Sequence, residues 1–162
     1  MNFTFNEDQH ALRDSISRFL MVEAAPEKLR AIWQTDAGRS TELRSKLAEQ
    51  GITALSVPES AGGLGLGDVD WSLMNQELGY FGIPDSLSDT AYLATGLLSG
   101  LPENHPVRIK WLPLIADGSV RIALGHPVNP WVADAHLADL LLLAHPTATG
   151  TEWHALTPDQ IT

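Results

Sequence analysis

Apolar residues recur every three or four positions through most of the first 117 residues, which is the spacing of one face of an α-helix. The first stripe follows Asn6 and Gln9, a pair spaced as in a helix-initiating capping box. The pattern therefore predicts a helix after Asn6, and further helices over residues 26–33, 40–50, 68–80, 84–101 and 106–116.

Glycine, proline and aspartate mark the predicted helix ends. Gly51 stands where a left-handed C-terminal cap is expected, and the glycine-rich segment 52–67 is expected to be a loop. Asp68 is the expected N-cap of the following helix, and Pro84 is expected to open the one after it.

The pattern changes after Gly118, where short apolar runs replace the helical stripes. We expect strands over residues 120–124, 139–144 and 153–156. The predicted fold is mainly α, with an all-α domain over 1–117 and the first strands of an incomplete β domain over 118–162. So few strands leave unpaired edges, so we expect the β part to continue or to be completed by another chain.

The 162 residues carry a formal net charge of −10 and contain no cysteine. An acidic chain is poorly suited to nucleic acid or to an anionic membrane surface, because both require lysine and arginine. The absence of cysteine excludes disulfides and thiolate chemistry. The sequence shows neither a signal peptide nor a bilayer-spanning run, and we expect a cytoplasmic protein.

Residue types that often carry chemistry give weak signals here. The loop Gly62–Gly67 lacks the spacing of a phosphate-binding motif, so a structural connection is the preferred interpretation. Four histidines after residue 125 lack the spacing of metal ligands, and no metal site is expected. Glu59 and Glu77 are interpreted as structural, and no nucleophile motif is present.

Two stretches together carry a family resemblance. The first contains, in order, Gly51-Ile52, Val57-Pro58-Glu59, Gly62-Gly63-Leu64-Gly65 and a helix ending in Glu77-Leu78-Gly79. The second runs from Lys110 through Pro113 to Gly118. In this order and spacing, the chain resembles the N-terminal half of the acyl-CoA dehydrogenase family, over essentially its whole length.

The resemblance implies an N-terminal helical domain, a middle β domain and a C-terminal helical bundle, with FAD bound mainly by parts outside this chain. The complete flavoprotein would act in fatty acid or lipid metabolism and oxidise an acyl-CoA thioester to the trans-2-enoyl-CoA. The family's catalytic glutamate would lie outside this chain, so no residue here is given a catalytic role and the segment alone is expected to be inactive.

The resemblance also implies binding residues. The stretch matching the family's Thr-Glu-Pro motif has Gly125 in place of the threonine, and the Gly-Ser-Asp loop is absent. Flavin contacts from Ile122, Leu124 and Gly125 are therefore expected through the main chain. Leu87, Ala91 and Thr95 share one face of the helix after Pro84 and are the expected wall of an acyl pocket, with ordinary helix packing as the alternative.

Two other functions remain open at this stage. The altered motif resembles non-catalytic partner subunits of heteromeric family members, which makes a structural or interaction module the first alternative. A flavin monooxygenase or acyl-CoA oxidase on the same scaffold is the second, because a fold does not determine chemistry. In each reading the chain is expected to assemble with the rest of its protein or with a partner subunit, as a homo- or hetero-oligomer.

Overall fold

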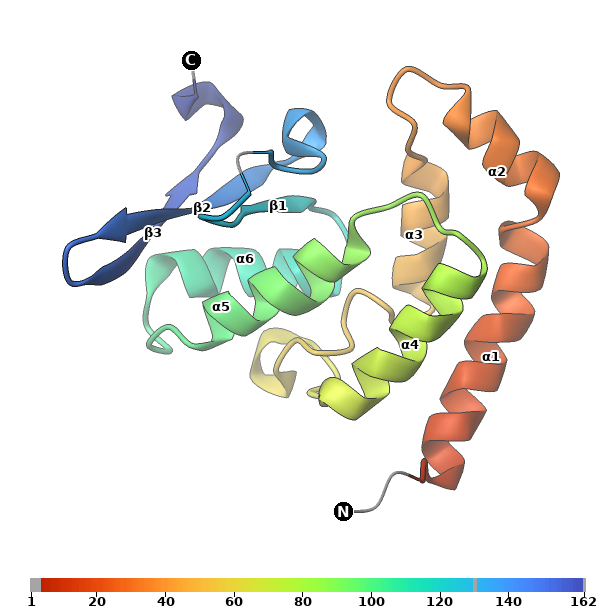
Figure 1. Cartoon of the computed structure of the whole chain (residues 1–162). Coiled ribbons are helices and arrows are strands. Elements are labelled where there is room, and N and C mark those ends of the chain that lie inside the picture. The colour runs from red at the N-terminus through yellow and green to blue at the C-terminus, as the bar shows by residue number, and fades with distance from the viewer. Residues whose placement is uncertain (1–3, 130, 162) are drawn as a thin grey trace.

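The computed structural model describes residues 4–129 and 131–161 and has a helical part followed by a small sheet. In Figure 1, α1 to α4 lie together at one side, and the sheet lies beside α5 and α6 at the other. This arrangement confirms the predicted fold class. The helices are α1 (Glu7–Glu23), α2 (Pro26–Trp33), α3 (Thr41–Glu49), α4 (Asp68–Tyr80), α5 (Thr95–Ser99) and α6 (Pro106–Ala116).

The helix ends follow the cap chemistry of the sequence, with one shift. Asn6 and Gln9 form the expected capping box, since Gln9 N–H donates to Asn6 Oδ1 at 2.8 Å and Asn6 N–H donates to Gln9 Oε1 at 3.0 Å. Gly51 adopts the left-handed conformation with φ +81°. The prediction for α4 was wrong by one residue, because Gly67 is the N-cap and its N–H donates to Asp70 Oδ2 at 3.1 Å.

The helix predicted to open at Pro84 contains a π-helical segment. Helical structure begins at Leu87, residues Asp89–Ala94 form the π-helix η2, and α5 continues from it. Short 3₁₀ turns cover Glu59–Ala61, Ala135–Leu137 and Pro158–Gln160. The π-helix was not predicted, and this rare element is frequent at functional sites.

The sheet has the strand order β1-β2-β3 within the described residues. β1 (Ile122–Gly125) pairs in parallel with β2 (Leu140–Thr147), and β2 pairs antiparallel with β3 (Gly150–Leu156). All three predicted strands are confirmed, with β2 and β3 longer than predicted. β1 and β3 are the two edges.

The apolar residues form two main clusters. One lies among the helices and includes Ile16, Leu20, Leu47 and Met74. The other joins α6 to the sheet, where Leu112 and Ile115 pack with apolar residues of β1 and β2. The strands therefore share a core with the helices. Among the described residues, no helix is long and apolar enough to cross a membrane.

Candidate functional site

The π-helix η2 packs against the free edge of β1. Thr90 of η2 is fully buried, and its Oγ1 makes two hydrogen bonds to the main chain of Ile122. It donates to the Ile122 carbonyl oxygen at 3.0 Å and accepts from the Ile122 N–H at 3.0 Å. Thr95 Oγ1 in turn donates to the Thr90 carbonyl oxygen at 3.2 Å. One hydroxyl thus ties the helix to the strand edge.

The three predicted acyl-pocket residues are all buried within the chain. Leu87 and Ala91 belong to the apolar cluster among the helices, and Thr95 lies at the start of α5. Leu87 additionally lines a cavity of about 200 Å³ between α4 and the start of this helix, which we call the α4 cavity. The α4 cavity is lined by Asn75, Leu78, Gly79, Gly82, Ile83, Asp85, Leu87 and Ser88.

The three predicted flavin-contacting residues all lie on β1. The main-chain groups of Ile122 are occupied by Thr90. Because peptide groups alternate between the two edges of a strand, the N–H and C=O of Leu124 face the same free edge as those of Ile122. At Gly125 a Cβ atom would lie 2.7 Å from Leu143 Cδ2 and 3.1 Å from Val132 Cγ2, so a larger residue would require these two side chains to shift.

A buried ionic network lies beside the α4 cavity. Asp85 accepts hydrogen bonds from Arg44 and, at 2.7 Å, from Arg121 Nη2, and its side chain is 4% exposed. Arg44 Nη2 also donates to the Val120 carbonyl oxygen at 2.8 Å. Burial lowers the pKa of Arg44, although the Asp85 carboxylate opposes the shift. This network joins α3, the loop before η2 and the start of β1.

A second ion pair holds the loop after β1. Arg39 Nε donates to Asp134 Oδ2 at 2.9 Å, and Arg39 Nη2 lies 2.8 Å from Asp134 Oδ1. Asp134 adopts a left-handed conformation with φ +54°. Burial acts to raise the pKa of Asp134, but the hydrogen bonds and charge of Arg39 outweigh it, and the pKa is lowered. Burial and the nearby Asp134 charge raise the pKa of Asp89.

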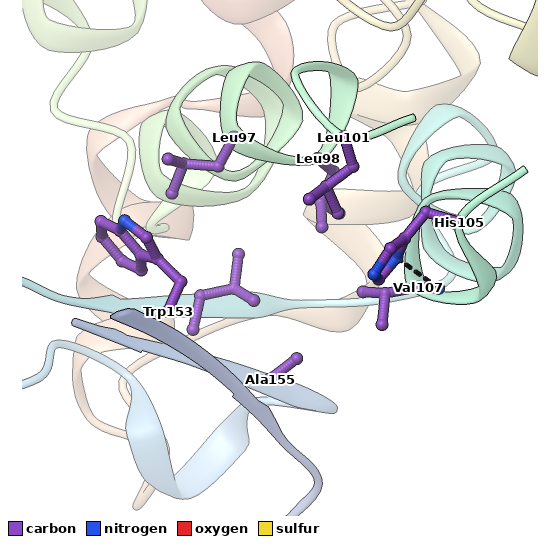
Figure 2. A pocket seen from close by; sticks show the side chains of 8 residues that line it. Leu97, Leu98, Leu101, His105, Val107, Trp153 and Ala155 are labelled. Atoms are coloured by element: carbon purple, nitrogen blue, oxygen red, sulfur yellow. Dashed lines mark hydrogen bonds between the residues drawn. The ribbon is translucent and has the colours of Figure 1, made fainter. Parts of the chain in front are cut away.

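A larger apolar cavity of about 310 Å³ lies between α5, the start of α6 and the sheet, and we call it the sheet cavity. It is lined by Leu97, Leu98, Leu101, His105, Val107, Leu142, Trp153 and Ala155. Figure 2 shows the imidazole of His105 and the indole of Trp153 on opposite sides of it. His105 Nδ1 accepts from the Val107 N–H at 3.3 Å. Trp153 is 42% exposed, so an apolar surface remains open here.

The glycine-rich loop uses its own donors internally. The N–H groups of Leu64, Gly65 and Leu66 donate to carbonyl oxygens of residues 54–57 at 2.8–2.9 Å. At Gly63 a Cβ atom would lie 2.0 Å from the Val57 carbonyl oxygen. The loop is therefore a tight connection. In the part of the chain that the structure describes, no group of three or more metal-binding side chains comes together.

Sequence reasoning missed Thr90, Asn75 and the Asp85 network. Thr90 sits one residue before Ala91 and carries no motif. Asp85 was noted only as a helix opener, and its arginine partners lie 41 and 36 positions away in the sequence. A polar residue inside the apolar stripe of a helix was the one available signal for Thr90.

Comparisons with known proteins show which family this chain is similar to. The family model described as "Acyl-CoA dehydrogenase, N-terminal domain" matches residues 6–119. The curated acyl-CoA dehydrogenase IpdE2 of Mycolicibacterium smegmatis is 30% identical over 155 residues, which are 94% of this chain and 47% of that protein.

Solved structures share the fold. The ChsE4-ChsE5 complex from Mycobacterium tuberculosis matches with a TM-score of 0.84 and 22% identity, over 97% of this chain and 49% of that chain. An acyl-CoA dehydrogenase complexed with FAD from Bacillus anthracis matches with a TM-score of 0.73 and 21% identity, over 96% of this chain and 31% of that chain. The chain thus spans about half the length of the curated relative, or less of some solved chains.

Proposed function

Because this chain belongs to the acyl-CoA dehydrogenase family, we propose that it forms the N-terminal portion of a flavoprotein that oxidises an acyl-CoA thioester to the trans-2-enoyl-CoA. Residues 1–117 would be the helical domain, and 118–162 would open the middle β domain. FAD would accept the hydride. The remaining half, present in the longer relatives, would supply the catalytic base and most of the FAD site.

The contact between η2 and β1 is the observation that carries this proposal. The helix η2, which contains Ala91 of the residues expected at the acyl group, contacts β1, which carries the set expected at the flavin, Ile122, Leu124 and Gly125. A dehydrogenase needs its acyl chain and its flavin side by side, since a hydride passes between them. The two hydrogen bonds of Thr90 to Ile122 hold η2 against β1.

The residues of β1 fit a limited contact to FAD. Main-chain groups of Leu124 face the open edge of the strand, whereas Ile122, Leu124 and Gly125 offer no side-chain donor. When bound, FAD would supply the hydride acceptor. The role of this chain would be to present the main-chain groups of Leu124 to the cofactor, beside Ile122, whose main-chain groups are bonded to Thr90 of η2.

A non-catalytic subunit is the second candidate. The missing side-chain donors on β1 favour it, because such a chain would keep the fold without holding the flavin firmly. One matched structure is described as a complex of two differently named proteins, ChsE4 and ChsE5. In this alternative the chain would complete the site of a partner subunit.

In both cases we propose that a further length of chain, from the rest of the protein or from a partner subunit, covers the sheet cavity and pairs with β3. The open edge of β3, the exposed Trp153 and the apolar lining of the cavity are continuous. The matched family members are about twice as long, so a second half of suitable size exists in them. Extended chain with apolar side chains would satisfy both the strand edge and the cavity.

The test is the intact mass of the purified protein measured together with its absorbance between 350 and 500 nm. A flavin spectrum with turnover of an acyl-CoA panel would support the dehydrogenase. A protein of 17.6 kDa without flavin, inactive on every acyl-CoA, is the result expected of the segment alone and would favour the subunit alternative over the dehydrogenase. The subunit alternative would then be tested by restoring activity with a copurifying partner.

A further inference from the structure

The hydroxyl of Thr90 determines where along β1 the helix η2 lies. In a helix, a threonine hydroxyl often bonds a carbonyl oxygen of its own preceding turn. Here both of its hydrogen bonds reach another element, at 3.0 Å each, and both involve the main chain of Ile122. Ala94 and Ile122 also share an apolar cluster, but apolar packing has no preferred direction. The two directional bonds therefore set the register between the helix and the strand.

This contact is closed to solvent. Thr90 and Ile122 are both 0% exposed, so water does not reach the two bonds that the hydroxyl makes. Thr95 Oγ1 donates to the Thr90 carbonyl oxygen at 3.2 Å and is itself buried. A row of two buried hydroxyls thus joins the start of α5 to β1 through η2.

The contact lies between the two sets of expected binding residues. Ala91 follows Thr90 directly and belongs to the set expected at the acyl group. Leu124 lies two residues beyond Ile122 on the same strand edge, about 7 Å along it, and belongs to the set expected at the flavin. A displacement of η2 along β1 would change the distance between the two sets. Hydride transfer is sensitive to such a change, since a misplacement of about 1 Å can cost about a hundredfold in rate.

We propose that Thr90 is a positioning residue of the dehydrogenase, which aligns the acyl group with the flavin through the main chain of Ile122. The proposal rests on the proposed function, because it uses the binding roles assigned there. The hydroxyl is engaged by the strand, so Thr90 acts through β1 and not by a hydrogen bond to either ligand. Loss of the hydroxyl therefore slows hydride transfer more than it weakens the binding of acyl-CoA.

The experiment uses the complete flavoprotein, which is this chain with the rest of its protein or with its partner subunit. Each variant is mixed with saturated acyl-CoA esters from butanoyl-CoA to hexadecanoyl-CoA. The loss of flavin absorbance gives the limiting rate of reduction and the apparent dissociation constant of each ester. We expect Thr90→Val to lower the limiting rate by about 10- to 100-fold and to change the dissociation constant by less than about twofold. Thr90→Ser keeps the hydroxyl and retains most of the rate.

Thr53→Val is the matched control. Thr53 is also fully buried, and its Oγ1 donates to the Ala116 carbonyl oxygen at the end of α6, at 3.1 Å. This variant loses a buried hydroxyl of the same kind, and we expect it to reduce the flavin at the unmodified rate. Amide hydrogen exchange in the 162-residue chain is the second readout. Relative to the amides of β2, exchange at Ile122 becomes faster in Thr90→Val and stays unchanged in Thr90→Ser and Thr53→Val.

The outcomes separate the positioning role from the proposed function. Flavin reduction by Thr90→Val at the unmodified rate overturns the positioning role alone. Equal slowing in Thr53→Val also overturns it, because any loss of a buried hydroxyl would then have the same effect. Failure of every ester to reduce the flavin of the unmodified protein overturns the proposed function itself. If Thr90→Val does not fold, Thr90→Cys replaces it in the same comparisons, because a thiol is only a weak donor and acceptor.

Discussion

The hydroxyl of Thr90 takes the place of a neighbouring strand at the free edge of β1, since it pairs with both main-chain groups of Ile122. Replacing Thr90 by valine keeps the shape and removes both bonds. The buried N–H and C=O of Ile122 then lack partners, and we expect the free energy of unfolding to fall by about 2–4 kcal/mol in urea denaturation.

Thr90→Ser is the matched control, because it retains the hydroxyl and loses only a methyl group. We expect it to cost about 1 kcal/mol. Equal losses for the serine and valine variants would show that the hydroxyl contributes no more than the methyl group to holding η2 on β1.

Gly118 offers a second test at the scale of one residue. Its φ is +75°, and a Cβ atom there would lie 2.3 Å from Ala48 Cβ. Strain and overlap together predict that Gly118→Ala lowers the free energy of unfolding by about 2–4 kcal/mol. Gly96→Ala, in α5 with no atom within 4 Å of the new Cβ, should leave stability equal or slightly higher. Thermal denaturation measures the stability of both variants. Similar losses of stability in Gly118→Ala and Gly96→Ala would contradict the prediction.

Asp134 predicts a pH dependence. Its pKa in the folded protein is lowered, so its pairing with Arg39 stabilises the fold above the pKa of the unfolded chain and is lost as pH falls through the folded value. Asp134→Asn keeps a residue that tolerates φ +54° but removes the charge. We expect the variant to be less stable than the unmodified protein at pH 7, and we expect this difference to shrink as the pH falls below the ordinary range of an aspartate carboxyl. Asp36→Asn, at an exposed position, is the control and should show no such pH-dependent difference.

At the scale of elements, the cap and stripe rules predicted most helices and all three strands, because those signals are local. The π-helix η2 could not be predicted this way. Its extra residue per turn is imposed by packing on β1, where Thr90 needs to reach Ile122 and Ala94 needs to enter the core. The predicted face of Leu87, Ala91 and Thr95 assumes regular α-helical spacing, which the π-helix η2 does not keep, although Leu87 and Ala91 still share one apolar cluster.

The Asp85 network holds three elements together. Local sequence patterns could not predict it, since its members are far apart in the sequence. Asp85→Asn leaves two buried guanidinium groups without their carboxylate, so we expect a loss of about 3 kcal/mol or more in the free energy of unfolding. The control is Asp14→Asn in the exposed Arg13–Asp14 pair, which should leave stability unchanged. Urea denaturation measures both. A small effect at Asp85 would mean that water replaces the carboxylate.

At the scale of the whole molecule, the order of the motifs identified the family correctly, because the loop and cap residues that define the helical part are read directly from the sequence. The cavities depended on side chains from distant elements. Trp153 and His105, for example, face one another across the sheet cavity from residues 48 positions apart. The binding roles expected on β1 and on residues 87–95 stay predictions, since the matched relatives are about twice as long as this chain.

The shared core between α6 and the sheet predicts how the two parts depend on each other. Ile122, Leu140 and Leu142 are buried against Leu112 and Ile115, and each buried side chain of this kind contributes about 1.5–3 kcal/mol. Their combined contribution approaches the whole stability of a typical domain, about 5–15 kcal/mol. A fragment of residues 1–117 should therefore unfold at much lower urea concentration than the 162-residue chain, with a broader transition by circular dichroism.

Substituting Ile122 by alanine within the full chain tests the same contact without truncation. We expect a loss of about 2–5 kcal/mol, because the side chain is fully buried between helix and sheet. A fragment 1–117 that unfolds as cooperatively and at the same midpoint as the whole chain would mean that the helical part is independent. The sheet would then be only an attached segment, and its contact with η2 could not be what fixes the site.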